Sequence, residues 1–150
     1  MKENIKKNII EKYATLTEKI AKSGNQSKHF ETDVEIYRSE IHIISVIGHN
    51  DDIHISEIAR KFGVTKGAIS KTIKKLEKKG LVEKAIDKTN NTRTLVKLTE
   101  KGLKAHYAHE KYHNEYDKDM FSYLESLNER ELEILDTFLE KANQMAERHI

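Results

Sequence analysis

Two histidines in the C-terminal half of the chain are spaced for joint chemistry. His109 and His113 stand four residues apart, so in a helix both side chains fall on one face. Two neutral imidazoles on one face can bind a single tetrahedral metal ion such as Zn²⁺. The chain contains no cysteine, which excludes thiolate ligands and thiol nucleophiles. The pair is therefore compatible with a nitrogen-ligated metal, although two unrelated surface histidines explain most pairs of this kind.

A second group of residues is suited to DNA. The stretch 65–75 begins with Thr65, a residue type that caps helix N-termini, and continues with small, polar and basic side chains. A helix that reads the major groove needs such side chains in its first turns and cations nearby for phosphates. An ordinary lysine-rich surface helix is the alternative. We expect Ala68, Ile69 and Ile73 to pack inward. The residues of this helix that we expect to contact DNA are Thr65, Lys66, Gly67, Ser70, Lys71, Lys74 and Lys75.

Enzymatic chemistry has little support in the sequence. The chain has no Gly-rich phosphate loop and no Gly-x-Ser-x-Gly motif, the signatures of phosphate binding and of a serine nucleophile. Neighbouring carboxylates such as Asp51 and Asp52 lie in a polar run that is typical of a solvated loop. We therefore expect a protein that is not an enzyme.

Hydrophobic periodicity predicts the elements that position these residues. Asp33 and Asn128 are residue types that cap helix N-termini, and each precedes a stretch with apolar residues at helical spacing. The chain contains no proline, which fits long uninterrupted helices. The predicted helices cover about residues 3–22, 34–47, 55–62, 66–79, 99–127 and 129–148.

The central part of the chain predicts a helix-turn-helix followed by a β-hairpin. Gly63 closes the helix over 55–62, and Thr65 caps the next one after a turn of three or four residues, which is the helix-turn-helix pattern. After Gly80 the apolar period changes to two, which predicts strands at 81–85 and 93–98. A hairpin directly behind the second helix is a wing.

The charge of the chain is unevenly distributed. Residues 53–104 hold 14 Lys and Arg against 5 Asp and Glu, a balance of +9, whereas the whole chain carries +2. A basic middle between acidic ends favours a polyanion-binding module, with a solvated lysine face as the alternative. No window approaches 18 uncharged apolar residues, and the N-terminus lacks the apolar core of a secretion signal. We therefore expect a cytoplasmic protein with no membrane partner.

The order of these elements resembles the MarR family of transcriptional regulators across essentially the whole chain. The resemblance implies one domain over 1–150, mainly α with a small β-wing. Its winged helix-turn-helix DNA-binding core would cover 31–99, flanked by N- and C-terminal dimerisation helices over 1–30 and 100–150. It also implies a homodimer that binds a pseudo-palindromic operator in double-stranded DNA. The matching stretches are SEIA at 56–59, VTKGAIS at 64–70, IKKLEKKGLV at 73–82 and LVKLTEKG at 95–102.

The predicted wing departs from the family pattern, which reads Asp-x-x-Asp-x-Arg. Asp87 matches the first Asp, but Asn90 and Thr92 stand at the second Asp and at the Arg, and Arg93 follows one position late. In a strand, one step turns a side chain to the other face unless the turn absorbs it. The wing residues that we expect at DNA are Lys88, Asn90 and Arg93, with Arg93 in the minor groove.

A second resemblance concerns the zinc-responsive branch of this family, which represses zinc-uptake genes. That branch carries two histidines at i,i+4 on the helix after the wing, where His109 and His113 stand here, and one on its second helix, where His42 stands. The resemblance implies a regulatory Zn²⁺ on these three residues. The branch's acidic fourth ligand has no clear counterpart, although His29 or Glu31 could fill the role. A second metal site of the branch is expected to be missing, and the histidines expected to face solvent are His49, His54, His106 and His149.

These observations lead to three hypotheses. The first is a homodimeric repressor that senses zinc through His42, His109 and His113, and whose metal-bound state changes operator affinity. The second is a regulator of the same fold controlled by a small organic ligand, often phenolic, at the junction of the dimerisation and DNA-binding parts. The third, from another class, is a helical protein-interaction module that does not bind DNA.

Overall fold

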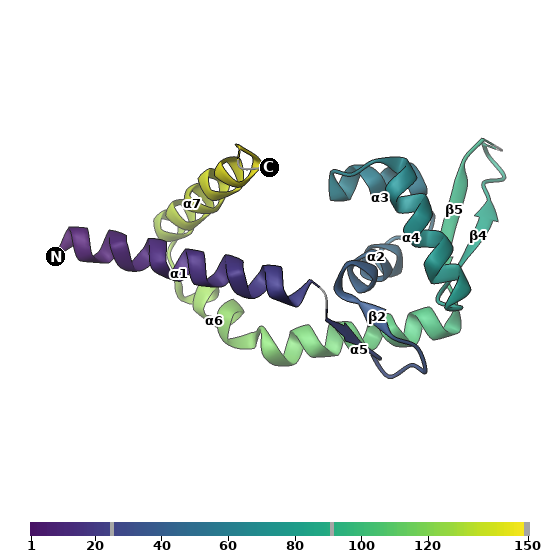
Figure 1. Cartoon of the computed structure of the whole chain (residues 1–150), viewed down its shortest axis with the longest axis horizontal. Helices are drawn as coiled ribbons and strands as arrows, with labels where there is room; N and C mark the ends of the chain where they lie inside the picture. The colour runs from purple at the N-terminus through teal and green to yellow at the C-terminus, as the bar shows by residue number, and fades with distance from the viewer. Residues whose placement is uncertain (25, 91, 149–150) are drawn as a thin grey trace. The chain divides into compact units, whose positions relative to one another are not determined.

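The computed structural model describes residues 1–24, 26–90 and 92–148 (Figure 1). The chain divides into two compact units, Met1–Glu110 and Lys111–Ile150, and the helix α5 (Glu100–Tyr116) begins in the first unit and ends in the second. The other helices of the first unit are α1 (Lys2–Ser23), α2 (Arg38–Gly48), α3 (Ile55–Phe62) and α4 (Lys66–Lys78). Its strands are β1 (Ser27–Lys28), β2 (Ile36–Tyr37), β3 (Ile53–His54), β4 (Val82–Ile86) and β5 (Thr94–Leu98).

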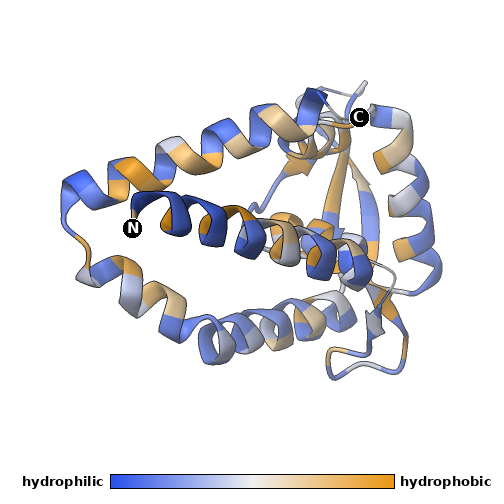
Figure 2. Ribbon diagram, turned by 60° about the vertical axis from the view of Figure 1, so that its left-hand side comes forward, coloured by the Kyte–Doolittle hydropathy of each residue, from blue (hydrophilic) through white to orange (hydrophobic). Residues whose placement is uncertain are grey.

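The core of the first unit is built mainly from isoleucine. Branched side chains on α2, α3, α4 and the strands pack into one cluster, and burying each such side chain contributes about 1.5–3 kcal/mol. Hydrophobic and hydrophilic residues alternate along the long helices (Figure 2), as amphipathic helices require. The largest side chains that are almost completely buried are Ile36, Ile41, Ile44, Ile58, Ile73, Leu76, Leu81 and Val96.

The wing belongs to a three-stranded antiparallel sheet with strand order β3-β5-β4. Strand β4 pairs with β5 from Val82 opposite Leu98 to Ile86 opposite Thr94, and β3 adds the pair of Ile53 and Val96. The hairpin leaves the end of α4 and lies beside that helix (Figure 1). A mainly helical chain with a small β-wing is thus confirmed, and the short strand β3 joins the wing to the start of α3.

Two helix boundaries differ from the prediction. Helix α2 starts at Arg38 rather than near residue 34, because Ile36 and Tyr37 pair with β1 as a short strand. Asp33 therefore caps no helix, and its carboxylate lies 2.8 Å from the Lys101 ammonium. The predicted long helix over 99–127 is two helices, since α5 ends at Tyr116 and α6 (Lys118–Ser126) follows.

The second unit contains the end of α5, together with α6 and α7 (Glu129–Arg148). Asn128 caps α7 as predicted: its side-chain oxygen accepts from the Glu131 amide at 3.1 Å, and the Glu131 carboxylate accepts from the Asn128 amide at 2.9 Å. This reciprocal pair satisfies two helix-end donors. Within the described residues, no helix is both long and apolar enough to span a membrane.

Candidate nucleic-acid interface and histidine cluster

The turn between α3 and α4 aims the start of α4 outward. Gly63 adopts a left-handed conformation with φ 62°, which glycine reaches without the steric cost of a side chain. The Thr65 hydroxyl then accepts a hydrogen bond from the Ala68 amide at 3.2 Å. This cap satisfies one of the free donors at the helix start. Other amides of the first turn stay available to an anion such as a DNA phosphate.

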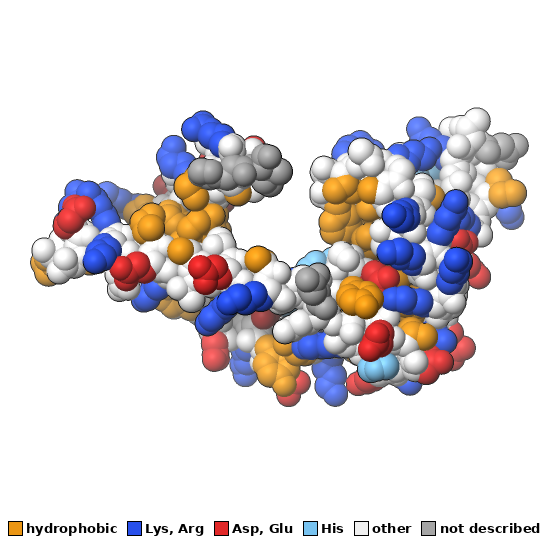
Figure 3. Space-filling view, viewed as in Figure 1, with side chains coloured by type: hydrophobic (Ala, Val, Ile, Leu, Met, Phe, Trp, Pro, Cys, Tyr) orange, Lys and Arg blue, Asp and Glu red, His pale blue; other side chains and the backbone are white. Residues whose placement is uncertain are grey.

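The exposed face of α4 carries cations and small residues. Lysine side chains gather over this helix (Figure 3), while Ile69 and Ile73 are buried beneath it. Ala68 is exposed, so the prediction that it packs inward is wrong. Ser70 is half-buried. The exposed residues among those predicted at DNA are Thr65, Lys66, Gly67, Lys71, Lys74 and Lys75.

Lys79, just after α4, has a structural role, unlike the exposed lysines of that helix. Its ammonium lies 2.6 Å from a carboxylate oxygen of Glu40 and 2.7 Å from the Glu35 carbonyl. Glu40 is only 5% exposed, and it also accepts from the Tyr37 amide at 2.9 Å. A buried carboxylate needs such a cation beside it. This pair therefore anchors the C-terminal end of α4 on the start of α2.

The turn of the wing is held by side-chain hydrogen bonds. One Asp87 carboxylate oxygen accepts from the Thr89 amide at 2.8 Å and from the Thr89 hydroxyl at 2.6 Å. Asn90 repeats the pattern, accepting from the Thr92 amide and hydroxyl. The Asn90 side-chain oxygen is therefore used to shape the turn. Lys88 and Arg93 are exposed.

His54 connects this wing to the start of α3. Its Nε2 lies 2.8 Å from Asp87 Oδ2 and its Nδ1 lies 2.9 Å from Glu57 Oε2. Both ring nitrogens face carboxylates, so both must carry protons to donate. The hydrogen bonds to Asp87 and then Glu57 raise the pKa of His54, and Thr89 together with His54 lowers the pKa of Asp87. The expectation that His54 faces solvent is wrong.

His42 and His109 lie together between α2 and α5. Their ring centroids are 5.7 Å apart, and the Phe30 ring packs edge-to-face with His109 at the same centroid distance. His109 is only 7% exposed. Phe30 and Glu31 adopt left-handed backbone angles, with φ of 45° and 59°, so the segment that carries the candidate ligands turns sharply where it reaches α5.

His113 and the residues around it add a signal that the sequence prediction missed. Residues 109–113 read His-Glu-Lys-Tyr-His, the spacing with which a helix presents two histidines to zinc beside a general base in metalloproteases. Here Glu110 instead lies 3.7 Å from His49 Nε2. In the second unit, His113 Nδ1 forms a hydrogen bond with the Asp117 carboxylate. Because a carboxylate accepts, this bond places the proton on Nδ1 and the lone pair of the ring on Nε2.

The remaining predictions for histidines have mixed outcomes. His49 is exposed as expected, but His106 is buried, so that expectation is wrong. Burial, and after it the neighbouring His49, lowers the pKa of His106. His149 lies outside the described residues.

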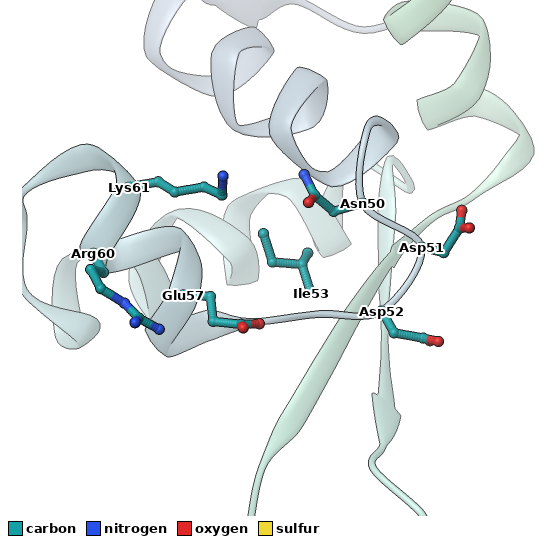
Figure 4. Close-up of a pocket in the computed structure, with 7 residues that line it drawn as sticks. All are labelled: Asn50, Asp51, Asp52, Ile53, Glu57, Arg60 and Lys61. Atoms are coloured by element: carbon teal, nitrogen blue, oxygen red, sulfur yellow. The ribbon is translucent and has the colours of Figure 1, made fainter.

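An open cavity of about 500 Å³ lies between the α2–β3 loop and α3 (Figure 4). Ile53 is at its centre, and the carboxylates of Asp51 and Asp52 point away from Arg60 in this view. Pockets for organic ligands are mostly apolar, and this one is mostly charged or polar. Its lining consists of Asn50, Asp51, Asp52, Ile53, Glu57, Arg60 and Lys61.

A helix-turn-helix with an outward-facing basic second helix, followed by a β-hairpin, defines a winged helix-turn-helix DNA-binding protein. The family model described as MarR family matches residues 36–94, the part that contains α2, α3, α4 and most of the wing. Over these residues the chain is similar to the MarR family of transcriptional regulators. Together with the similarity to curated HTH-type transcriptional regulators, this match indicates a regulator of transcription that binds DNA.

Individual proteins show the same similarity. The chain is 28% identical to the uncharacterized HTH-type transcriptional regulator YhjH of Bacillus subtilis, over 87% of this chain and 81% of that protein. Its fold matches the adhesin competence repressor AdcR of Streptococcus pyogenes with a TM-score of 0.74 at 23% identity, over 91% and 96% of the two chains. It also matches Lactococcus lactis ZitR, a zinc-responsive MarR family member, with a TM-score of 0.68 at 18% identity, over 93% and 97%.

Proposed function

We propose that this regulator is a homodimeric repressor whose operator binding is controlled by Zn²⁺ held by His42, His109 and His113. The observation that carries the proposal is the meeting of His42 from α2 with His109 from α5, with ring centroids 5.7 Å apart. Two imidazoles from different helices can supply two of the nitrogen ligands of a metal site. ZitR, which is zinc-responsive, and AdcR, which is a repressor, share the fold; the first supports control by zinc and the second supports repression.

The third ligand follows from helix spacing. His113 comes four residues after His109 on α5, which puts both on one helical face. The Asp117 carboxylate at His113 Nδ1 would hold the ring in the tautomer whose lone pair lies on Nε2, the nitrogen that would bind the metal. A fourth protein ligand would come from His29 or Glu31, since the Phe30 between them touches His109.

The residues around the metal explain how it would act on DNA binding. Bound Zn²⁺ would supply a cross-link between imidazoles of α2 and α5. Helix α2 packs against β5, and α5 begins just after β5 ends. Fixing α2 against α5 therefore narrows the positions open to the wing and to α4. In a dimer, this restriction would favour the conformations in which the two copies of α4 stand at one particular spacing.

DNA contact is assigned to α4 and the wing. We propose that the first turns of α4 enter the major groove, with Lys66, Ser70 and Lys71 at bases or phosphates. Lys88 and Arg93 would reach the backbone or the adjacent minor groove from the wing. Thr65 would act mainly as the cap that orients these residues, because its hydroxyl is bound to the Ala68 amide. Gly67, Lys74, Lys75 and Asn90 complete the proposed interface.

A zinc titration of the metal-free full-length protein tests the regulatory part. We expect calorimetry to show binding that is lost in the His109→Ala/His113→Ala variant and kept in the control variant Lys111→Ala/Glu115→Ala on the same helix. Affinity should fall as the pH drops through about 6.5, because the ligands must be neutral imidazoles. Equal zinc affinity in wild type and the double histidine variant would remove this site.

A second candidate effector is a small organic, often phenolic, ligand. An open cavity of about 740 Å³ lies between the 31–33 segment and α5, where Leu103 and Tyr107 offer apolar surface among charged side chains of both signs. Pockets for small organic ligands combine apolar walls with a few polar groups. Operator binding that responds to a phenol, and is unchanged by zinc, would favour this effector instead.

A further inference from the structure

A second histidine cluster lies at the end of α2, away from His42. His49 follows the last residue of α2, and His106 and Glu110 stand four residues apart on α5. One nitrogen or carboxylate oxygen from each of the three residues lies within 4.8 Å of the other two. All three belong to the first unit, so the geometry of the cluster is set within that unit.

His49 already has the orientation of a metal ligand. Its Nδ1 lies 2.8 Å from the Ser45 carbonyl oxygen, which can only accept, so Nδ1 carries the proton. The lone pair is therefore on Nε2, which lies 3.7 Å from Glu110 Oε1. A histidine held through one nitrogen by a backbone carbonyl, with the other nitrogen facing a second donor, is the usual arrangement around protein-bound metals.

His106 supplies an independent sign of a missing partner. The side chain is 5% exposed, and among the described residues its Nδ1 has no hydrogen-bond partner. A buried polar atom without a partner costs about 1–3 kcal/mol, so its presence calls for an explanation. The ring packs closely against α2: a Cβ atom at Gly48 would lie 2.7 Å from it. It meets the His49 ring edge-on, with centroids 4.9 Å apart.

We infer that His49, His106 and Glu110 form a second site for a divalent transition-metal ion, distinct from the one proposed above. Two imidazoles and one carboxylate are a donor set that Zn²⁺ accepts, with water in the remaining position. Zinc bonds of about 2.0–2.2 Å at tetrahedral angles put ligand atoms roughly 3.3–3.6 Å apart. The pair of His49 and Glu110 is already near that separation, and both side chains are partly exposed, so they can close on His106.

The three candidate ligands come from two elements: His49 follows α2, whereas His106 and Glu110 lie on α5. An ion here would tie the end of α2 to α5. Because binding favours the folded state, it would also raise the thermal midpoint of the protein.

Counting bound zinc in the full-length protein tests this inference. The test variants are His49→Ala and Glu110→Gln, because the buried His106 is the one whose replacement endangers folding. The control is Glu115→Gln, an exposed carboxylate on the same helix. In equilibrium dialysis against Zn²⁺ with elemental analysis, each test variant should bind one ion fewer per subunit than wild type and the control. The rise in thermal midpoint produced by Zn²⁺ should also be smaller in both.

The outcomes separate this site from the proposed regulatory one. If both exist, wild type binds two ions and the His109→Ala/His113→Ala variant keeps one. If only the site at His49 exists, wild type binds one ion, which that double variant retains and His49→Ala loses. Unchanged zinc content and unchanged thermal response in both His49→Ala and Glu110→Gln would overturn the inference.

Discussion

At the scale of single residues, His54 carries a pH dependence that its sequence context does not suggest. Both of its ring nitrogens face carboxylates, at 2.8 Å and 2.9 Å, and these raise its pKa. A raised folded-state pKa stabilises the fold fully below the ordinary value of about 6.5. That contribution is lost as the pH rises through the raised value, so the joint between wing and α3 weakens on the alkaline side.

We predict that His54 titrates above the ordinary histidine value. Replacing Asp87 with Asn removes the larger cause of the raised pKa, so the pKa of His54 should be lower in that variant. It should stay above the ordinary value, because the hydrogen bond to Glu57 remains. Nuclear magnetic resonance of the His54 ring protons across pH 5 to 9 measures both values. An ordinary pKa in the wild-type protein would show that the bridge does not form in solution.

Residue roles were predictable where they depend on near neighbours in sequence. Thr65 as a cap and Asn128 as a cap are confirmed because their partners lie three residues away. The roles of His54 and Lys79 were missed because their partners lie 33 and 39 residues away. Only the fold brings those charges together, and a lysine in a basic helix resembles its DNA-facing neighbours until its partner is known.

At the scale of elements, Gly102 sets how closely α5 follows the wing. A Cβ atom there would lie 2.0 Å from the Leu81 carbonyl oxygen and 3.3 Å from the Leu98 side chain. We predict that Gly102→Ala lowers the free energy of unfolding by about 1–3 kcal/mol or more, because overpacking a filled site usually has a cost of this size. Urea unfolding followed by circular dichroism measures the change.

Gly67→Ala is the matched control for this prediction. A Cβ at Gly67 meets only the Thr65 hydroxyl, at 3.9 Å, and alanine favours helix over glycine by about 0.5–1 kcal/mol. The control should therefore be neutral or slightly stabilising. If Gly102→Ala unfolds at the same urea concentration as Gly67→Ala, the close packing of α5 on Leu81 is contradicted.

Most elements were predictable because their signals are local. Helix α1 was expected over 3–22 and covers Lys2–Ser23, and α3 was expected over 55–62 and covers Ile55–Phe62. The start of α2 was missed because pairing with β1 removes Ile36 and Tyr37 from the helix. The break between α5 and α6 was missed because no proline or glycine marks it.

At the scale of the whole molecule, exposed apolar residues on the terminal helices predict an obligate homodimer. No described residue of α1, α6 or α7 is buried, although these helices carry large apolar side chains. Sequence patterns could indicate such faces but not what covers them. The exposed examples include Ile5, Ile9, Leu16, Phe121, Leu132 and Leu139.

We expect sedimentation velocity to find a dimer at micromolar concentration. Leu139→Glu, which places a charge on the apolar face of α7, should shift the protein toward monomer or cause it to unfold. The neighbouring substitution Glu140→Gln is the control and should leave the dimer intact. A folded wild-type monomer at micromolar concentration would overturn the assignment of these helices to dimerisation.

The central claim is that this protein contacts DNA through α4. The salt dependence of DNA binding tests this claim most directly. The protein is titrated with a duplex that wild type selects from random sequences, and affinity is measured at several salt concentrations. For Lys66→Ala/Ser70→Ala/Lys71→Ala we predict weaker binding and a log–log salt slope reduced by about two, since each lost phosphate contact contributes about 0.9. The control Lys12→Ala/Lys19→Ala, which removes two lysines from α1, should keep the wild-type slope. Wild-type affinity and slope in the triple variant would contradict the account.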